Sequence, residues 1–114
     1  MKKSEIIFNI ELDNKNIPEK IFWDATDNPN EGLEETKAIS IALWDHFHQN
    51  TLKIDLWTKE MPIGEMKRFY IETISGMADA LRTATGDEKM AGAIDDLCRT
   101  LSKNLEEELK KENS

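Results

Sequence analysis

The sequence predicts an α+β fold with the element order β-β-α-β-α-α, and three observations lead to this prediction. Residues 5–12 and 51–58 alternate apolar and polar side chains, which is the pattern of a strand with one buried face. Residues 19–26 show a similar alternation. Most of the apolar residues between positions 62 and 105 instead recur every three or four positions, which is helical spacing. Strands followed by helices are typical of an α+β protein.

The first two strands form a predicted hairpin. On residues 5–12, Ile6, Phe8, Ile10 and Leu12 share one face. The segment DNKNIP that follows contains residues that favour turns, and Pro18 is unsuited to a central strand. The segment EKIFWDAT, residues 19–26, then supplies the second strand.

The sequence of residues 27–58 predicts a loop, a helix and a third strand. Residues 27–32, DNPNEG, form the loop, and residues 33–47 the helix, because their apolar residues recur mostly at helical spacing. Residues 51–58 complete a three-stranded antiparallel sheet with Leu52, Ile54 and Leu56 on its core face. Trp57 is out of phase with these residues and therefore lies on the opposite face.

The C-terminal half predicts an antiparallel helical hairpin. Pro62 suits the first turn of one helix, and Thr85-Gly86-Asp87-Glu88 has the capping-box pattern that begins the next. The two helices have matched lengths of about 22 residues, or about 33 Å. We expect this hairpin to pack on one face of the sheet. Residues 1–114 then form a single domain, with 106–114 as a fraying charged tail.

Composition excludes several classes of function. The net charge of −8 opposes nucleic-acid binding, which needs clustered Lys and Arg. No apolar segment is long enough to cross a bilayer, and no secretory leader is recognisable, so we expect a cytoplasmic protein without membrane insertion. The single cysteine, Cys98, cannot form an internal disulfide and is expected to be a small buried side chain.

A search for catalytic or metal-binding groups gives weak candidates. Asp24, Asp27 and Asp55 could supply paired carboxylates, but abundant acidic residues favour a solvated surface. His46 and His48 are two positions apart, a spacing that points the side chains away from one another on a helix. We therefore predict no enzymatic activity, no catalytic residues, no metal and no cofactor.

The remaining candidate is a protein-interaction surface on the outer face of the predicted sheet. Tryptophan is enriched at interfaces, and the sequence places Trp57 there with Phe22. The candidate residues are Phe22, Asp24, Asp55, Trp57 and Lys59. An equally weighted alternative is that the predicted first helix, or a second copy in a homodimer, covers this face.

Four segments resemble the gliding-motility protein family GldC of Bacteroidetes-type bacteria. They are KIFWDATD (20–27), LKIDLWTKEMPIGEMKRFY (52–70), MADALRTATGDEKM (77–90) and DDLC (95–98). The resemblance extends over nearly the whole chain, in order.

This resemblance implies a small cytoplasmic accessory of the gliding machinery, which is coupled to type IX protein secretion. No enzymatic activity is attached to this family. The resemblance also implies partners among the machinery components, including the lipoprotein GldB. An alternative from size, acidity and fold class is a secretion chaperone or adaptor that binds an extended client segment.

Overall fold

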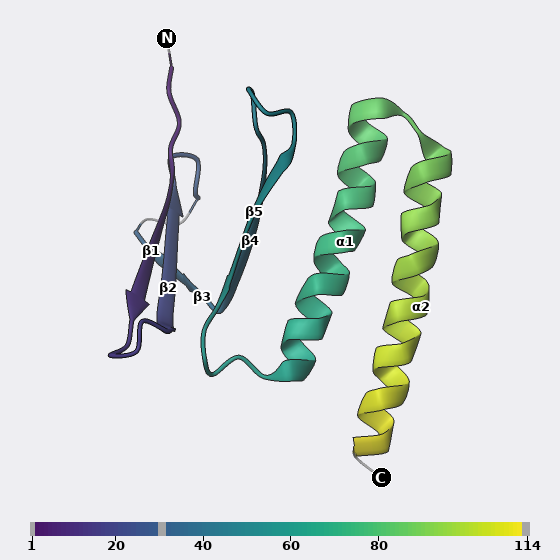
Figure 1. Ribbon diagram of the computed structural model, residues 1–114. Coiled ribbons are helices and arrows are strands. Elements are labelled where there is room, and N and C mark those ends of the chain that lie inside the picture. Colours follow the sequence, from purple (N-terminus) through teal and green to yellow (C-terminus); the bar gives the residue numbers. More distant parts are fainter. Residues whose placement is uncertain (1, 30–31, 113–114) are drawn as a thin grey trace. The chain divides into compact units, whose positions relative to one another are not determined.

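The computed structural model describes residues 2–29 and 32–112, and it confirms the α+β class (Figure 1). The chain divides into two compact units. Residues 1–61, the sheet unit, contain strands β1 to β5, and residues 62–114, the helical unit, contain α1 and α2. Within the described residues, neither helix combines the length and the apolar character needed to span a bilayer.

The first sheet of the sheet unit has the order β1-β2-β3 and is antiparallel. Its strands are β1 (Ile6–Leu12), β2 (Pro18–Ala25) and β3 (Glu34–Thr36). The predicted N-terminal hairpin is therefore confirmed. Ile21 of β2 lies between Ile10 of β1 and Thr36 of β3 and is fully buried.

The turn between β1 and β2 is organised by Asp13. Its Oδ1 accepts hydrogen bonds from the backbone N–H groups of Lys15 (2.8 Å) and Ile17 (3.0 Å). Asn16 adopts the left-handed conformation (φ 64°), which asparagine tolerates well. The turn residues that the sequence indicated thus act through an aspartate-centred turn.

The predicted helix over 33–47 is wrong, because these residues form β3 and the first strand of a second sheet. Strand β4 (Ala38–Trp44) pairs antiparallel with β5 (Thr51–Trp57) to make a separate two-stranded sheet. In this region Ile39, Ile41 and Leu43 alternate with smaller residues. Each lies opposite an aliphatic residue of β5, respectively Leu56, Ile54 and Leu52. These cross-strand pairs outweigh the helix propensity of Ala, Leu and Glu in the same segment.

The predicted single three-stranded sheet is corrected accordingly. The third predicted strand exists as β5, but it pairs with β4 rather than joining β1 and β2. Only Lys37 separates β3 from β4, and its carbonyl accepts the Thr58 N–H at 2.8 Å. The chain therefore passes from the first sheet to the second within a single residue, Lys37.

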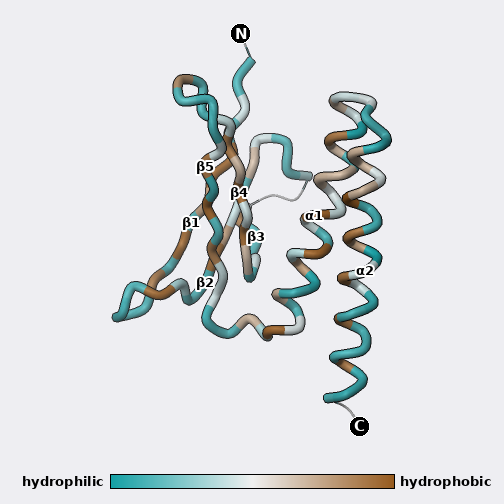
Figure 2. The backbone as a smooth tube through the Cα atoms, turned by 45° about the vertical axis from the view of Figure 1, so that its right-hand side comes forward, coloured by the Kyte–Doolittle hydropathy of each residue, from teal (hydrophilic) through white to brown (hydrophobic). Residues whose placement is uncertain are grey.

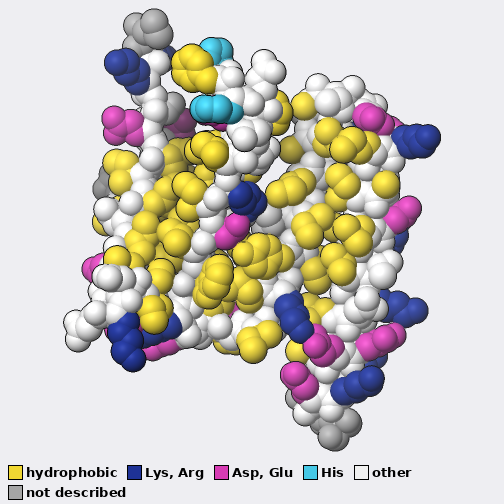
Figure 3. Space-filling view, in the orientation of Figure 1, with side chains coloured by type: hydrophobic (Ala, Val, Ile, Leu, Met, Phe, Trp, Pro, Cys, Tyr) yellow, Lys and Arg dark blue, Asp and Glu magenta, His cyan; other side chains and the backbone are white. Residues whose placement is uncertain are grey.

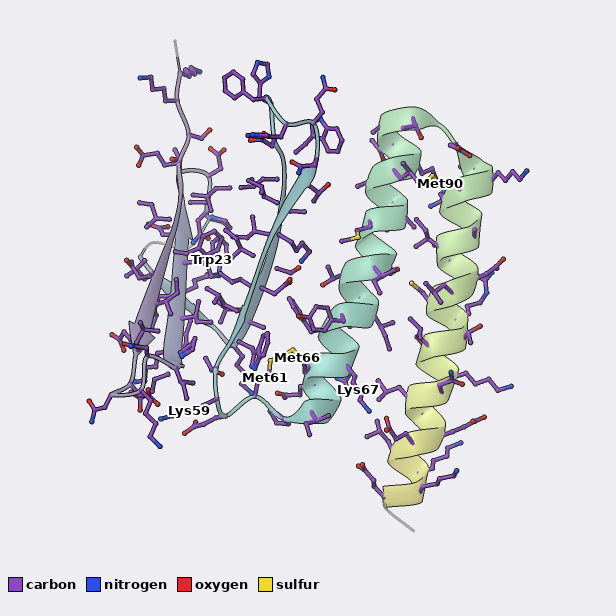
Figure 4. All side chains as sticks on the ribbon, viewed as in Figure 1. Trp23, Lys59, Met61, Met66, Lys67 and Met90 are labelled. Atoms are coloured by element: carbon purple, nitrogen blue, oxygen red, sulfur yellow. The ribbon has the colours of Figure 1, made fainter. Side chains whose placement is uncertain are left out.

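The helical unit is the antiparallel hairpin that the sequence predicts. Helices α1 (Ile63–Thr85) and α2 (Glu88–Glu112) carry recurring hydrophobic positions separated by polar ones (Figure 2). The buried hydrophobic residues described in this unit are small, namely Ala78, Ala91 and Cys98. Lys67 of α1 forms an ion pair with Glu108 of α2 at 2.7 Å (Figure 4). Cys98 is buried, as expected.

The junction between the helices differs in detail from the predicted capping box. Gly86 ends α1 in the left-handed conformation (φ 73°), and its N–H donates to the Arg82 carbonyl at 2.8 Å. Asp87, rather than Thr85, caps α2, because its Oδ1 accepts the Met90 N–H at 3.0 Å. Helix α2 continues through residues 106–112 of the predicted tail. Residues 30–31 of the predicted loop and 113–114 of the tail lie outside the described residues.

Candidate functional site

The candidate site lies on the β4–β5 hairpin of the sheet unit. Residues directly opposite one another in an antiparallel pair share a face, and so do alternate residues along a strand. The register pairs Ala38 with Trp57, Ser40 with Asp55, and Trp44 with Thr51. One face of the hairpin therefore carries a tryptophan at each end and polar residues between them. We call it the tryptophan face, composed of Ser40, Trp44, Lys53, Asp55 and Trp57.

The middle of the tryptophan face is held by hydrogen bonds. The Lys53 Nζ donates to Asp55 Oδ1 at 2.6 Å and also to Ser40 Oγ across the strand pair. These hydrogen bonds, first from Lys53 and then from Ser40, hold the pKa of the Asp55 carboxyl below its usual range. Asp55 is thus ionised and already paired near neutral pH, which suits a fixed polar contact rather than proton transfer.

The two tryptophans are accessible. Trp57 is 49% exposed and Trp44 is 70% exposed. An indole can contribute a large apolar contact area while its N–H donates a hydrogen bond, and this combination is common in protein interfaces. The chemical character of this face is therefore that of a binding surface.

The loop that joins β4 to β5 presents further aromatic groups. The Asp45 carboxylate accepts the His48 backbone N–H (2.6 Å) and contacts His48 Nδ1 (2.7 Å), and these contacts lower the pKa of Asp45. Phe47 is 86% exposed at this tip, and the His46 ring meets it edge-on. His46 and His48 thus lie on a hairpin loop rather than at the predicted helix end. Within the described residues, no group of three His, Cys, Asp or Glu side chains is arranged to hold a metal ion.

The structure separates the five residues that the sequence proposed for the interaction surface. Asp55 and Trp57 share the tryptophan face, whereas Phe22 and Asp24 lie on β2 of the other sheet. Phe22 is opposite Asn9 and Glu35, and Asp24 is opposite Ile7. Asp27, the third candidate carboxylate, lies in the turn after β2.

Lys59 has a different environment from the other four residues. It follows β5, and its Nζ contacts Asp13 Oδ2 at 3.1 Å and Glu19 Oε1 at 3.7 Å. Its backbone N–H also donates to the Pro18 carbonyl at 3.1 Å. Figure 4 labels Lys59 close to the turn between β1 and β2. These contacts connect the end of β5 to that turn, so Lys59 has a structural part within the sheet unit.

Sequence reasoning missed Ser40 and Trp44 as members of the face. The missed signal is the alternation Ser40, Ala42, Trp44, which is in phase with Lys53, Asp55 and Trp57 once the two segments are read as a hairpin. The helical period of the same segment instead predicts Trp44 in the apolar stripe of an amphipathic helix.

A second concave surface lies in the helical unit. A groove of about 620 Å³ runs along α1 and α2 and is lined by Tyr70, Ile71, Ile74, Leu101 and Leu105, among others. Charged residues border it, including the Lys67–Glu108 ion pair. Figure 3 shows hydrophobic side chains along both helices on the face in view, with charged side chains gathered near the C-terminal end of α2.

The chain was compared with known protein families, and one family model matches most of it. The model for the family "GldC-like: Gliding motility-associated protein GldC-like" matches residues 18–107, a region that includes β2 to β5, α1 and most of α2. No curated protein and no solved structure shows significant similarity to the chain.

Proposed function

Because the chain belongs to the GldC-like family of gliding motility-associated proteins, we propose that it is a non-catalytic accessory of bacterial gliding that acts by binding other proteins. It works in the cytoplasm, in association with type IX protein secretion. Its partners are components of the gliding and secretion machinery, with the lipoprotein GldB as one candidate. The tryptophan face is the surface that we assign to this binding.

One observation supports the assignment of the tryptophan face as the binding surface. Two exposed tryptophans flank a Lys53–Asp55–Ser40 network whose geometry is fixed before any partner arrives. Binding to such a surface costs little side-chain entropy, because the central polar groups are already ordered. Exposed indoles beside a small polar cluster also match the usual composition of an interface core and its rim.

The non-catalytic part of the proposal is supported by the state of Asp55. A general acid or base needs a pKa near the working pH, which for a carboxyl group means a raised pKa. The hydrogen bonds from Lys53 and Ser40 change the pKa of Asp55 in the opposite direction.

The test is partner capture with tryptophan variants. Trp57→Ala and Trp44→Ala should each weaken binding of machinery components by about thirtyfold or more, since truncating an interface hot spot costs about 2 kcal/mol. The measurement is affinity purification from the native cell, followed by titration of the co-eluting protein. Leu33→Ala is the matched control, because Leu33 is 53% exposed in the same unit but lies outside the hairpin.

Two results distinguish binding at the tryptophan face from binding elsewhere. Reduced capture by both tryptophan variants, with unchanged circular dichroism and normal capture by Leu33→Ala, supports the face. Full capture and normal gliding of the doubly substituted Trp44→Ala/Trp57→Ala strain would show that the partner binds elsewhere.

A second candidate function is a secretion chaperone or adaptor for an extended client segment. The observation that favours it is the outer edge of β5, since in the described sheet this strand pairs only with β4. An extended segment could add to this edge through its backbone, with Trp57 contacting a side chain. Titration with unfolded segments of secreted substrates tests this alternative, and absence of binding to such segments at about 100 μM would count against it.

A further inference from the structure

Strand β1 is the border strand of the first sheet (Figure 1), and no strand of the described residues pairs with its outer edge. Within the described residues its sheet partner is β2 alone. Ile6 is 69% exposed and Ile7 is 47% exposed. An apolar border strand of this kind is a template for pairing with another strand.

The hydrogen-bond pattern shows which backbone groups point outward. The Thr26 N–H donates to the Glu5 carbonyl at 3.0 Å, and the same register continues through Ile7 with Asp24 and Asn9 with Phe22. In an antiparallel pair, hydrogen-bonded and non-hydrogen-bonded positions alternate. The backbone N–H and C=O groups of Ile6, Phe8 and Ile10 therefore point away from β2.

The edge lacks the features that usually prevent pairing. Residues 6–10, IIFNI, contain no charge, no proline and no glycine. Charged residues, Glu5 and Glu11, occur only at the two ends, and the register irregularity lies between Glu11 and Leu12. The uncharged central part can therefore accept a complete ladder of backbone hydrogen bonds.

We propose that a second copy of this chain pairs antiparallel with β1, about a two-fold axis at Ile7. In this register Ile7 lies opposite Ile7 of the second copy, and Ile6 opposite Phe8. Lys3 then lies opposite Glu11 of the second copy, and the two-fold axis generates this pair twice. Outward backbone groups meet outward backbone groups, and the side-chain pairs nearest the axis, formed by Ile6, Ile7 and Phe8, are apolar. Beyond them, Asn9 lies opposite Glu5 and Ile10 opposite Ser4.

Neighbouring registers are less favourable. Moving the axis to Phe8 places Glu5 opposite Glu11 of the second copy, twice, and like charges directly opposite one another are destabilising. Moving the axis to Asn9 places Ile7 opposite Glu11. The charge pattern along residues 3–11 is thus self-complementary in the Ile7 register, which favours a second copy over an unrelated strand.

Pairing in this way would join the two three-stranded sheets into one continuous sheet. The net charge of −8 per chain opposes association, and salt at about 0.15 M screens that repulsion beyond about 8 Å while the Lys3–Glu11 contacts remain close. The proposal concerns an edge remote in sequence from the tryptophan face, and its test does not depend on gliding or partner capture.

The first experiment reads the register by cysteine cross-linking of the full chain. The native chain has one cysteine, Cys98, which is buried, so the background is low. In the proposed register Ile7 faces its own copy at a Cα separation of about 4.5 Å, which suits a disulfide. Ile7→Cys should form a disulfide-linked dimer under mild oxidation, whereas Asn9→Cys and Phe8→Cys should remain largely unlinked. Preferential linking at Phe8 or Asn9, or none at any position, would overturn the proposal.

The second experiment uses charge reversal and leaves the apolar strand intact. Lys3→Glu should raise the dimer dissociation constant at least about tenfold in analytical ultracentrifugation at 0.15 M salt, and Lys3→Glu/Glu11→Lys should restore it. Ile6→Pro removes an outward N–H only and should abolish the dimer while the sheet unit stays folded. A wild-type chain that stays monomeric at every accessible concentration, or charge variants with unchanged association, would refute the pairing.

Discussion

Asp13 stabilises the β1–β2 turn through one carboxylate that serves three donors. The backbone N–H groups of Ile17 and Lys15, and then the Lys59 ammonium, hold the pKa of this carboxyl below its ordinary value of 3.8. A carboxyl whose folded pKa is depressed stabilises the fold fully above its ordinary pKa. That contribution is lost as the pH falls through the lower folded pKa. It therefore affects the pH dependence of the free energy of unfolding only in the acidic range.

Asp13→Asn should therefore lower stability at pH 7 and reduce the further loss of stability on acidification to pH 3. The amide oxygen can still accept the two backbone N–H groups, but the negative charge is absent. Urea unfolding at several pH values below and above 3.8 measures both effects. Lys59→Met is the matched variant, and it should remove a smaller part of the acid dependence because the backbone donors remain. An Asp13→Asn curve parallel to that of the wild type would contradict this account.

Two glycines of the helical unit should respond in opposite directions to the same substitution. Gly86→Ala should destabilise by about 1 kcal/mol, because Gly86 has φ 73° and an L side chain is strained there. Gly76→Ala should stabilise by about 0.5–1 kcal/mol, because Gly76 lies within α1 and an added Cβ would meet no atom within 4 Å. Thermal unfolding followed by circular dichroism at 222 nm compares them, and equal signs would be inconsistent with this assignment.

At the scale of elements, the success of sequence reasoning depended on whether one period dominated a segment. Residues 5–12 and 51–58 alternate clearly, and both are strands, while α1 and α2 follow the helical spacing. Residues 33–47 carry both periods, since the alternation from Ile39 to Leu43 coexists with Ala, Leu and Glu. Only pairing with β5 decides between them, and that long-range interaction is invisible in a local pattern.

The same error explains which part of the candidate site could be anticipated. Alternation alone places Asp55 and Trp57 on one face, because both lie on β5. It cannot place Phe22 and Asp24 correctly, because the segment that pairs with β5 is predicted as a helix from its sequence. Trp44 and Ser40 join the face only through the β4–β5 register.

The two sides of the β4–β5 hairpin should respond differently to truncation. Ile39→Ala should destabilise the sheet unit by about 2–5 kcal/mol, since Ile39 is buried on the apolar side. Trp44→Ala, on the tryptophan face, should change stability by no more than about 0.5 kcal/mol, because its side chain is mostly exposed. Urea unfolding followed by the fluorescence of the remaining tryptophans distinguishes the two, and a large loss for Trp44→Ala would assign this residue to packing rather than to binding.

At the scale of the whole molecule, the question is whether the two compact units unfold together. The helical unit buries few hydrophobic side chains, namely Ala78, Ala91 and Cys98 among its described residues. A two-helix hairpin with so small a buried surface is marginally stable by itself. We therefore expect its unfolding to be coupled to that of the sheet unit, as the prediction of a single domain requires.

The chain offers separate probes for the two units. All three tryptophans lie in residues 1–61, and both described helices lie in residues 62–114. Ile21→Ala removes a fully buried side chain of β2 and should cost about 2–5 kcal/mol. In one cooperative domain it shifts the fluorescence transition and the 222 nm transition equally. Ala91→Leu, which overfills a fully buried position of α2, should cost about 1–3 kcal/mol and also shift both. If each substitution moves only the transition of its own unit, the chain is two independent domains.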